Sequence, residues 1–373
     1  MSGCLLIIFF LGLNALGGHE SAMNTLVSIS PLGDASTSDP ANLDAHVIRS
    51  LPVIVISPHN QCNCRCVMCD IWRIREPQEI AKADLQQHMA SFRELGVRWV
   101  VFSGGEPQMN SQLPYLAQML RGEGIRVTIL TAGLLLESQA EMIAGSVDDV
   151  IVSFDGPSAV HNRIRRVPGA YEQIAAGVRT LRQVRAGMVV RARCTVQKEN
   201  HQSLRATIAC ARETGLDSIS FLAADLTSSA FNRPEGWGEE RQHQIAPNAE
   251  EVEALDSEIE QLIRQYSAEL NSGFVVETAS KLRKIVRHFR AHLGQIPDVA
   301  PRCNAPWVSA VIDASGEVRP CFFHSPMGNI RTQSLPDILN GPEALRFRAN
   351  LDIGADPICR RCVCSLYIPP ATE

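Results

Sequence analysis

Apolar and polar positions alternate in two patterns between residue 51 and about residue 225. Short runs of apolar, β-branched residues predict buried strands, and between them apolar residues recur at the three- and four-residue spacing of amphipathic helices. The predicted strands are 52–57, 98–102, 125–130, 148–154, 188–196 and 218–222, and the predicted helices are 83–95, 112–121, 137–145, 170–185 and 202–214.

This alternation of strands and helices predicts an α/β fold with parallel strands. Parallel neighbours need crossover connections, and six strands joined by right-handed crossovers form either an open sheet or an incomplete barrel. In both architectures the functional residues belong at the carboxyl ends of the strands. The loops that follow the predicted strands are therefore where chemistry is expected.

The segments outside this pattern differ from it in composition. Residues 1–48 contain an apolar run, Leu5–Leu13, followed by a stretch rich in Ser, Asp, Pro and Ala. No Lys or Arg precedes the run, and it is too short to span a bilayer, so we expect a disordered leader or a start assigned too early rather than a signal peptide or an anchor. The expected domains are then a barrel over 49–231, a linker with helices over 232–296 and a Cys-rich module over 297–373.

Composition narrows the class of protein. A chain of 373 residues with 45% hydrophobic and 20% charged positions can form a sizeable core, and its length suggests two to three domains. The 35 basic and 40 acidic residues give a net charge of −5, which favours neither nucleic acid nor an anionic membrane as a partner. The 12 cysteines are roughly 3% of the chain, well below the share in small disulfide-stapled proteins.

The positions of the cysteines are more informative than their number. Four of them lie within eight residues, and five lie near the C-terminus. Such close spacing brings several thiolates within reach of one metal centre, whereas a disulfide fold distributes its cysteines between distant segments. Metal binding is therefore favoured for both groups. The first group is Cys62, Cys64, Cys66 and Cys69, and the second is Cys303, Cys321, Cys359, Cys362 and Cys364.

The first group follows the first predicted strand directly. The spacing Cys62-x3-Cys66-x2-Cys69 resembles the signature of radical S-adenosylmethionine (SAM) enzymes. The resemblance implies that these three thiolates hold a [4Fe–4S] cluster whose open iron binds the amino and carboxylate groups of SAM. A structural zinc site that uses any four of the cysteines is the alternative.

Further motifs carry the same resemblance over about residues 51–225, and it implies a partial (β/α)6 TIM-type barrel. Ser103-Gly104-Gly105-Glu106-Pro107 follows the second strand and resembles the family's glycine-rich element at the methionine end of SAM. Weaker matches follow later strands, although each can also be an ordinary turn, cap or solvated loop residue. The SAM contacts implied in this way come from Met68, Gly104, Gly105, Glu106, Thr131, Ser153, Asp155, Arg166 and Asn200, with Arg163 and Arg165 as neighbouring candidates.

The second cysteine group resembles the auxiliary-cluster extension called SPASM in its long form and twitch in its short form. The long form uses seven or more cysteines for two clusters, and only five are present here. The resemblance therefore implies one auxiliary [4Fe–4S] cluster, held by Cys303, Cys321, Cys359 and Cys362. Cys364 can replace Cys362 as a ligand, donate a hydrogen atom or serve as a structural thiol, and a zinc knuckle is the alternative for the whole module.

Two isolated residues are candidates for the chemical step. Cys194, on the fifth predicted strand, can donate a hydrogen atom to a substrate radical, although buried free cysteine is also a common core residue. Asp225 follows the sixth strand, where a carboxylate can act as a base or bind a hydroxyl or amine.

Together these features predict a cytoplasmic enzyme that cleaves SAM reductively and abstracts hydrogen from a substrate C–H bond. A single auxiliary cluster favours a two-electron oxidation of a small molecule, such as an aminosugar or cyclitol. A flavodoxin or ferredoxin is the expected electron donor, with no nucleic acid or membrane partner. A peptide maturase and an epimerase are alternatives within the family, and a non-catalytic iron–sulfur or zinc protein is the alternative from another class.

Overall fold

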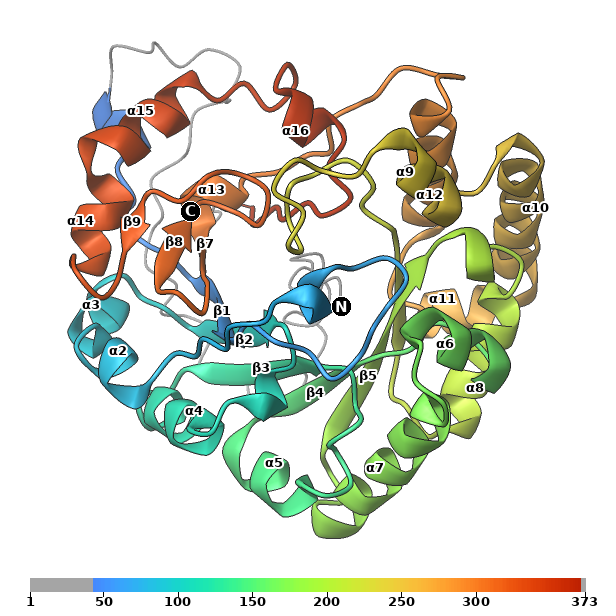
Figure 1. Cartoon of the computed structure of the whole chain (residues 1–373), viewed down its shortest axis with the longest axis horizontal. Helices are drawn as coiled ribbons and strands as arrows, with labels where there is room; N and C mark the ends of the chain where they lie inside the picture. Colours follow the sequence, from blue (N-terminus) through green and yellow to red (C-terminus); the bar gives the residue numbers. More distant parts are fainter. Residues whose placement is uncertain (1–42, 370–373) are drawn as a thin grey trace.

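The computed structural model describes residues 43–369. Six parallel strands form a curved sheet with helices along its outer side (Figure 1). All six strands predicted from the apolar runs are present, which confirms the α/β barrel architecture. They are β1 (Val53–His59), β2 (Trp99–Gly104), β3 (Arg126–Thr131), β4 (Asp149–Ser153), β5 (Val189–Val196) and β6 (Ile219–Ala223).

The outer helices follow the predicted amphipathic segments with two differences. The helix expected over 83–95 is divided at Gln87 and His88, where the buried imidazole of His88 contacts the carbonyl oxygen of Ile330 at 2.7 Å. An unpredicted helix, α6 (Ser158–Arg165), follows β4. The others along this part of the chain are α2 (Lys82–Gln86), α3 (Met89–Glu94), α4 (Leu113–Gly122), α5 (Ala140–Ser146), α7 (Ala170–Val184) and α8 (Leu204–Glu213), with 3-10 turns η3 (Ile71–Arg73), η4 (Pro107–Met109) and η5 (Lys198–Asn200).

The expected linker region packs against the barrel. The backbone of Val276 donates to the carbonyl of Ile219 on β6 at 2.9 Å, and the buried side chain of Glu277 accepts from the backbone of Phe221. Residues 232–296 thus extend the barrel wall rather than separating two modules. Their helices are α9 (Glu239–Ile245), α10 (Ala249–Gln265), α11 (Ser267–Ser272) and α12 (Ala279–His292).

The Cys-rich C-terminal region shares the barrel's sheet. Strand β7 (Ser309–Ile312) pairs in parallel with β1, and two short antiparallel strands follow, in the order β6-β5-β4-β3-β2-β1-β7-β8-β9. Because β7 lies beside β1, the second cysteine group is carried to the side of the barrel where the first one lies. The remaining elements are β8 (Glu317–Arg319), β9 (Gly328–Asn329), α13 (Ala305–Val308), α14 (Leu335–Asn340), α15 (Pro342–Asn350) and α16 (Pro357–Arg360).

The expected leader, residues 1–48, lies mostly outside the described residues, as does its apolar run Leu5–Leu13. Its last six residues are in contact with the C-terminal region. A 3-10 turn, η2 (Leu43–His46), is held by Arg348, whose Nε donates to the carbonyl of His46 at 2.7 Å. Among residues 43–369, no helix combines the length and apolar content needed to cross a membrane.

A buried charge network stabilises the amino-terminal ends of the strands. Asp149 on β4 accepts from Arg126 at 2.7 Å, from Thr128 at 3.0 Å and from Arg191 at 3.0 Å. We expect Asp149→Asn to lower the free energy of unfolding by about 3 kcal/mol, because it leaves two arginines without their counter-charge. Thermal unfolding would measure this. Glu123→Gln, at an exposed pair with Arg93, is the control and should cost less than about 1 kcal/mol.

Candidate active site

The loop that carries the first cysteine group is pinned against the end of β2. Gly105 donates its backbone N–H to the carbonyl of His59 at 3.2 Å, and Glu106 donates to that of Gln61 at 2.8 Å. A Cβ on Gly105 would lie 2.1 Å from the Gln61 oxygen, and one on Gly104 would lie 2.4 Å from the Ser57 Cβ. Gly104 is therefore required by the close approach of β1, and Gly105 by the close approach of the cysteine loop.

The thiols of the first group lie together. Cys64, Cys66 and Cys69 are buried, and Cys62 is half-buried. Hydrogen bonding of the Cys64 thiol to the sulfurs of Cys62 and Cys66 raises the pKa of Cys64, and the same contact lowers the pKa of Cys66. Burial raises the pKa of Cys69. Since thiolates are the form that binds metal, this converging set fits a [4Fe–4S] cluster, and Cys64 supplies a hydrogen bond beside it.

A buried arginine from α6 contacts the same group. Arg165 is 1% exposed, and its Nη1 lies 3.5 Å from the sulfur of Cys66. Its Nη2 forms an ion pair with Asp155 at 2.5 Å. The helix ends at Arg166, which has a left-handed backbone conformation and an exposed side chain. Of the three arginines after β4, Arg165 is therefore the one placed at the cysteines, while the assignment of Arg166 to SAM stays a prediction.

Glu106 is turned into the protein interior. Its carboxylate accepts hydrogen bonds from the hydroxyl of Thr131 at 2.8 Å and from the backbones of Ala132 and Gln108 at 2.8 and 3.1 Å. Burial raises the pKa of Glu106 to about 6, although these hydrogen bonds oppose the shift. Glu106 and Thr131 thus join the ends of β2 and β3. The contacts of Glu106 and of the two glycines to SAM stay predictions.

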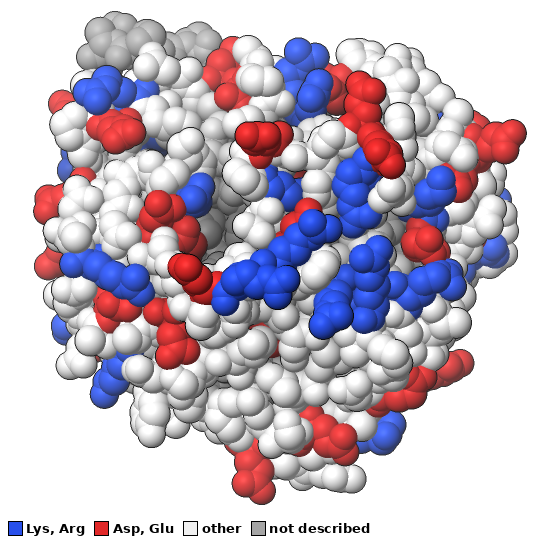
Figure 2. All heavy atoms as spheres, viewed as in Figure 1, with Lys and Arg blue, Asp and Glu red and all other residues white. Residues whose placement is uncertain are grey.

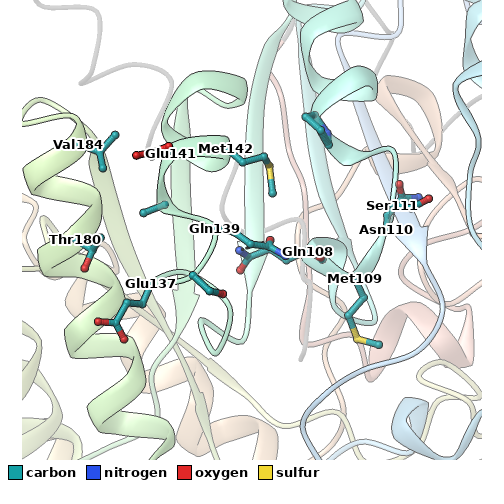
Figure 3. A pocket seen from close by; sticks show the side chains of 13 residues that line it. Gln108, Met109, Asn110, Ser111, Glu137, Gln139, Glu141, Met142, Thr180 and Val184 are labelled. Atoms are coloured by element: carbon teal, nitrogen blue, oxygen red, sulfur yellow. Dashed lines mark hydrogen bonds between the residues drawn. The ribbon is translucent and has the colours of Figure 1, made fainter.

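A surface hollow lies behind this motif, between η4, α4, α5 and α7 (Figure 3). It measures about 710 Å³. Gln108 and Gln139 meet in it through a 3.1 Å hydrogen bond, and Gln108 also joins Thr131. The described cysteines are absent from its lining. We therefore place the chemistry elsewhere, at the carboxyl ends of the strands.

Asp155, Asn200 and Cys194 lie together between the ends of β4 and β5. The Asn200 amide donates to the carbonyl of Asp155 at 3.0 Å and lies 3.5 Å from the Cys194 sulfur. Cys194 is fully buried, and burial raises its pKa well above the ordinary value. Ser153 and Met68 are also buried. Two of the predicted SAM residues, Asp155 and Asn200, are thus brought together, with Cys194 beside them in the core. The contacts of all these residues to SAM stay predictions.

Asp225 is engaged by its neighbours. Its carboxylate forms an ion pair with the buried Arg233 and accepts from the hydroxyl of Ser228 at 2.5 Å. Arg233 was not expected from the sequence. It also lies over the ring of Trp237, whose indole N–H donates to Asp70 beside the cysteine loop at 2.6 Å. The segment after β6 is therefore held against the end of the first cysteine loop.

A cavity of about 490 Å³ opens at the carboxyl ends of β1 and β2. One side of it comes from the glycine-rich motif, and another comes from the C-terminal region. The ring of Phe231, which follows β6, packs near those of Phe322 and Phe323, next to Cys321. The polar residues that line the cavity include His59, Asn60, Ser103, Asn232, Arg233, Asp313 and Arg319. The Ser103 hydroxyl is buried without a hydrogen-bond partner among the described residues, which fits a bound polar ligand.

All five cysteines of the second group line one further cavity. Burial raises the pKa of Cys303, of Cys359 and of Cys362, and it raises that of Cys321 to about 11. Because metal binding stabilises thiolates in such surroundings, the set fits an auxiliary cluster. His324 is an unexpected member, with its Nε2 3.5 Å from the Cys359 sulfur. The backbone N–H of Cys364 donates to the Cys362 sulfur at 3.2 Å. The assignment of Cys362 as the fourth ligand stays a prediction.

The outer face near the first cysteine loop is basic. Figure 2 shows Lys and Arg side chains gathered there. Burial lowers the pKa of Arg241, and the positive charges of Arg166 and Arg73 lower it further, against the opposing effect of Asp70. Arg241 is in contact with the loop itself, because its Nη2 donates to the carbonyl of Val67.

Family comparisons agree with this geometry. Residues 56–211 match the radical SAM superfamily, and residues 303–363 match the SPASM iron–sulfur cluster-binding domain. The chain therefore is a radical SAM protein with a SPASM domain, and these domains carry one SAM-binding [4Fe–4S] cluster and an auxiliary cluster. The expectation of a radical SAM family member with an auxiliary cluster domain is confirmed.

The similar proteins carry the names of different activities. The chain is 32% identical to an AdoMet-dependent heme synthase of Oleidesulfovibrio alaskensis, over 37% of each chain, so it spans less than half of that relative. It is 26% identical to the pre-heme d1 synthase of Dinoroseobacter shibae, over 83% of this chain and 78% of the relative. SuiB of Streptococcus suis, solved with its precursor peptide SuiA, has a similar fold, with a TM-score of 0.59 and 16% identity over 83% of this chain and 70% of SuiB.

Proposed function

We propose that this protein oxidises a C–H bond of a small polar molecule by two electrons, with hydrogen abstraction at the SAM site and electron transfer to the auxiliary cluster. The observation that carries the proposal is the 490 Å³ cavity, which has lining residues from both the glycine-rich motif and the SPASM region. A substrate held there would lie beside the glycine-rich motif and beside Phe322, which follows Cys321. An aminosugar or cyclitol whose hydroxyl becomes a ketone is the substrate we favour.

The side chains around the cavity suit such a substrate. Asn60, Asp313 and Arg319 offer acceptors and donors for hydroxyl and amine groups. When bound, the reduced cluster supplies the electron that cleaves SAM to methionine and a 5′-deoxyadenosyl radical. Loss of a hydrogen atom from the substrate carbon, of a proton from its hydroxyl and of one electron would turn the alcohol into a ketone. The auxiliary cluster, held by the second cysteine group, would accept that electron. Asp225 is our candidate to receive the proton, because its carboxylate forms an ion pair with Arg233, which lines the cavity.

The test of this proposal uses anaerobically reconstituted protein with SAM, dithionite and a panel of aminosugars and cyclitols. We expect 5′-deoxyadenosine and an equal amount of oxidised product from one substrate class. No 5′-deoxyadenosine after full cluster incorporation would contradict an enzymatic role and favour an iron–sulfur or zinc protein without catalysis.

Cys321→Ala separates the two redox steps. Because Cys321 lies with the second group, we expect the variant still to cleave SAM but to give at least about tenfold less product per 5′-deoxyadenosine. Product yield and 5′-deoxyadenosine are measured in the same reaction. Cys210→Ala, on α8, is the control. An unchanged product ratio in Cys321→Ala would remove the auxiliary cluster from the reaction.

A carboxylate-bearing tetrapyrrole is the second candidate. Arg233 and Arg319 both line the cavity and can pair with carboxylates, and two relatives are named as heme or pre-heme d1 synthases. Peptide modification has the fold similarity to SuiB in its favour, which concerns the fold alone. Including a tetrapyrrole and a peptide in the substrate panel distinguishes these classes, because only the correct class should raise 5′-deoxyadenosine formation above the substrate-free rate.

A further inference from the structure

Arg165 places a fixed positive charge against one ligand of the SAM-binding cluster. Its guanidinium is 1% exposed, and Nη1 lies 3.5 Å from the Cys66 sulfur. The charge cannot be lost by deprotonation, since an arginine keeps its proton in proteins. Away from water, such a charge acts over several ångströms with little screening.

The position of Arg165 is fixed by several independent contacts. The carbonyl of Arg165 accepts from the backbone N–H of Arg65 at 3.1 Å, and the carbonyl of Ile164 accepts from Val67 at 2.9 Å. The end of α6 thus holds the loop on both sides of Cys66. On the other side of the guanidinium, Asp155 forms its ion pair at 2.5 Å and accepts from the backbone of Thr195 at 2.9 Å.

We propose that Arg165 is a positioning residue that sets the reduction potential of the SAM-binding cluster, with Asp155 as the opposing charge. Reduction adds one negative charge to the cluster, and a cation beside Cys66 stabilises that reduced form. Asp155 contributes in the opposite direction, and it pairs with Nη2 of Arg165 whereas Nη1 contacts the sulfur. This inference concerns the cluster itself and holds whichever substrate the enzyme uses.

The two charges give the proposal a sign test. Arg165→Gln removes the cation and leaves Asp155 uncompensated, so we expect the equilibrium constant for one-electron reduction to fall about tenfold, which is about 59 mV. Asp155→Asn removes the anion and should shift the potential in the positive direction. The double variant Asp155→Asn/Arg165→Gln should lie between Arg165→Gln and the parent, because Arg165 is the charge in contact with Cys66, while no buried charge is left unpaired.

The measurement is an anaerobic redox titration of the full-length holoprotein, followed by electron paramagnetic resonance without SAM. The signal of this cluster is identified separately, as the one that changes when SAM is added. Arg163→Gln is the matched control on the same helix, because Arg163 is exposed and pairs with Glu199. Iron content of each variant reports whether the cluster is retained.

Shifts of opposite sign in the two single variants, with partial recovery in the double variant, would support the proposal. The proposal would be overturned if the potentials of the two single variants shifted in the same direction. It would also be overturned if both potentials equalled that of the Arg163→Gln control. Should Arg165→Gln lose its iron, Arg165→Lys decides. The lysine keeps the charge, so a potential about 59 mV or more below the parent value would contradict an electrostatic role.

Discussion

Replacing Cys62, Cys66 and Cys69 together by alanine abolishes 5′-deoxyadenosine formation and removes about half of the bound iron. This is the expected result because three thiolates of one loop hold the SAM-binding cluster, whereas the second group lines a separate cavity in the SPASM region. The loop cannot substitute for them with its remaining cysteine, since Cys64 alone offers one sulfur. Iron and sulfide quantitation, with chromatographic detection of 5′-deoxyadenosine, would measure both effects.

The same variant tests how the cysteines are divided between the two centres. Retention of the other half of the iron supports an auxiliary cluster on the second group, and the complementary loss should follow from alanines at Cys303 and Cys321. Complete loss of iron and sulfide from the Cys62/Cys66/Cys69 variant would instead leave the second group without a cluster. Cys210→Ala serves as the control for general effects of removing a thiol.

Much of the barrel could be predicted from the sequence because its strands are buried on both faces. In β1 every residue is buried, so the chain shows a continuous apolar, β-branched run that stands out from the amphipathic helices. Helix α6 lacks such a signal. Of its eight residues only Val160 and Ile164 are large and apolar, and buried polar side chains, His161 and Arg165, complete its inner face.

The sequence motifs of the candidate site could be predicted, but the distant residues that contact those motifs could not. The cysteine spacing and the glycine-rich element are local in sequence, so both could be read directly. Arg165 acquires its role from Cys66, 99 residues earlier, and the sequence gives no direct sign of such a contact. One signal was available: His161 and Arg165 are four residues apart, which places both on one face of a helix.

The contacts of Glu106 also depend on residues that lie far from it in the sequence. A glutamate after two glycines at a strand end suggested a contact to SAM, but packing between β2 and β3 uses its carboxylate to join the two strands. Likewise, the glycines were expected to allow the backbone to approach SAM. The nearest atoms to a Cβ at Gly104 belong to Ser57 on β1, and those nearest to a Cβ at Gly105 belong to the backbone just before Cys62.

That close approach makes Gly105 the most sensitive single backbone position at the site. We expect Gly105→Ala to lower the rate of 5′-deoxyadenosine formation by about 10²-fold, because the Cβ would lie 2.1 Å from the Gln61 carbonyl oxygen and a displacement of about 1 Å has that effect on positioned groups. The clash involves backbone on both sides, so the cysteine loop itself must move. Iron content and the rate at saturating SAM would be measured together.

Gly145→Ala is the matched control, since a Cβ there meets nothing within 4 Å and the residue lies in helix α5. It should gain about 0.5–1 kcal/mol of stability with unchanged activity. If Gly105→Ala retained full iron and full activity, the loop would tolerate a shift away from β2, and the contact between motif and loop would not determine cluster geometry. If it lost activity with its iron intact, the displaced loop would still hold the cluster but present it wrongly to SAM, which is the outcome that the two backbone hydrogen bonds from Gly105 and Glu106 lead us to expect.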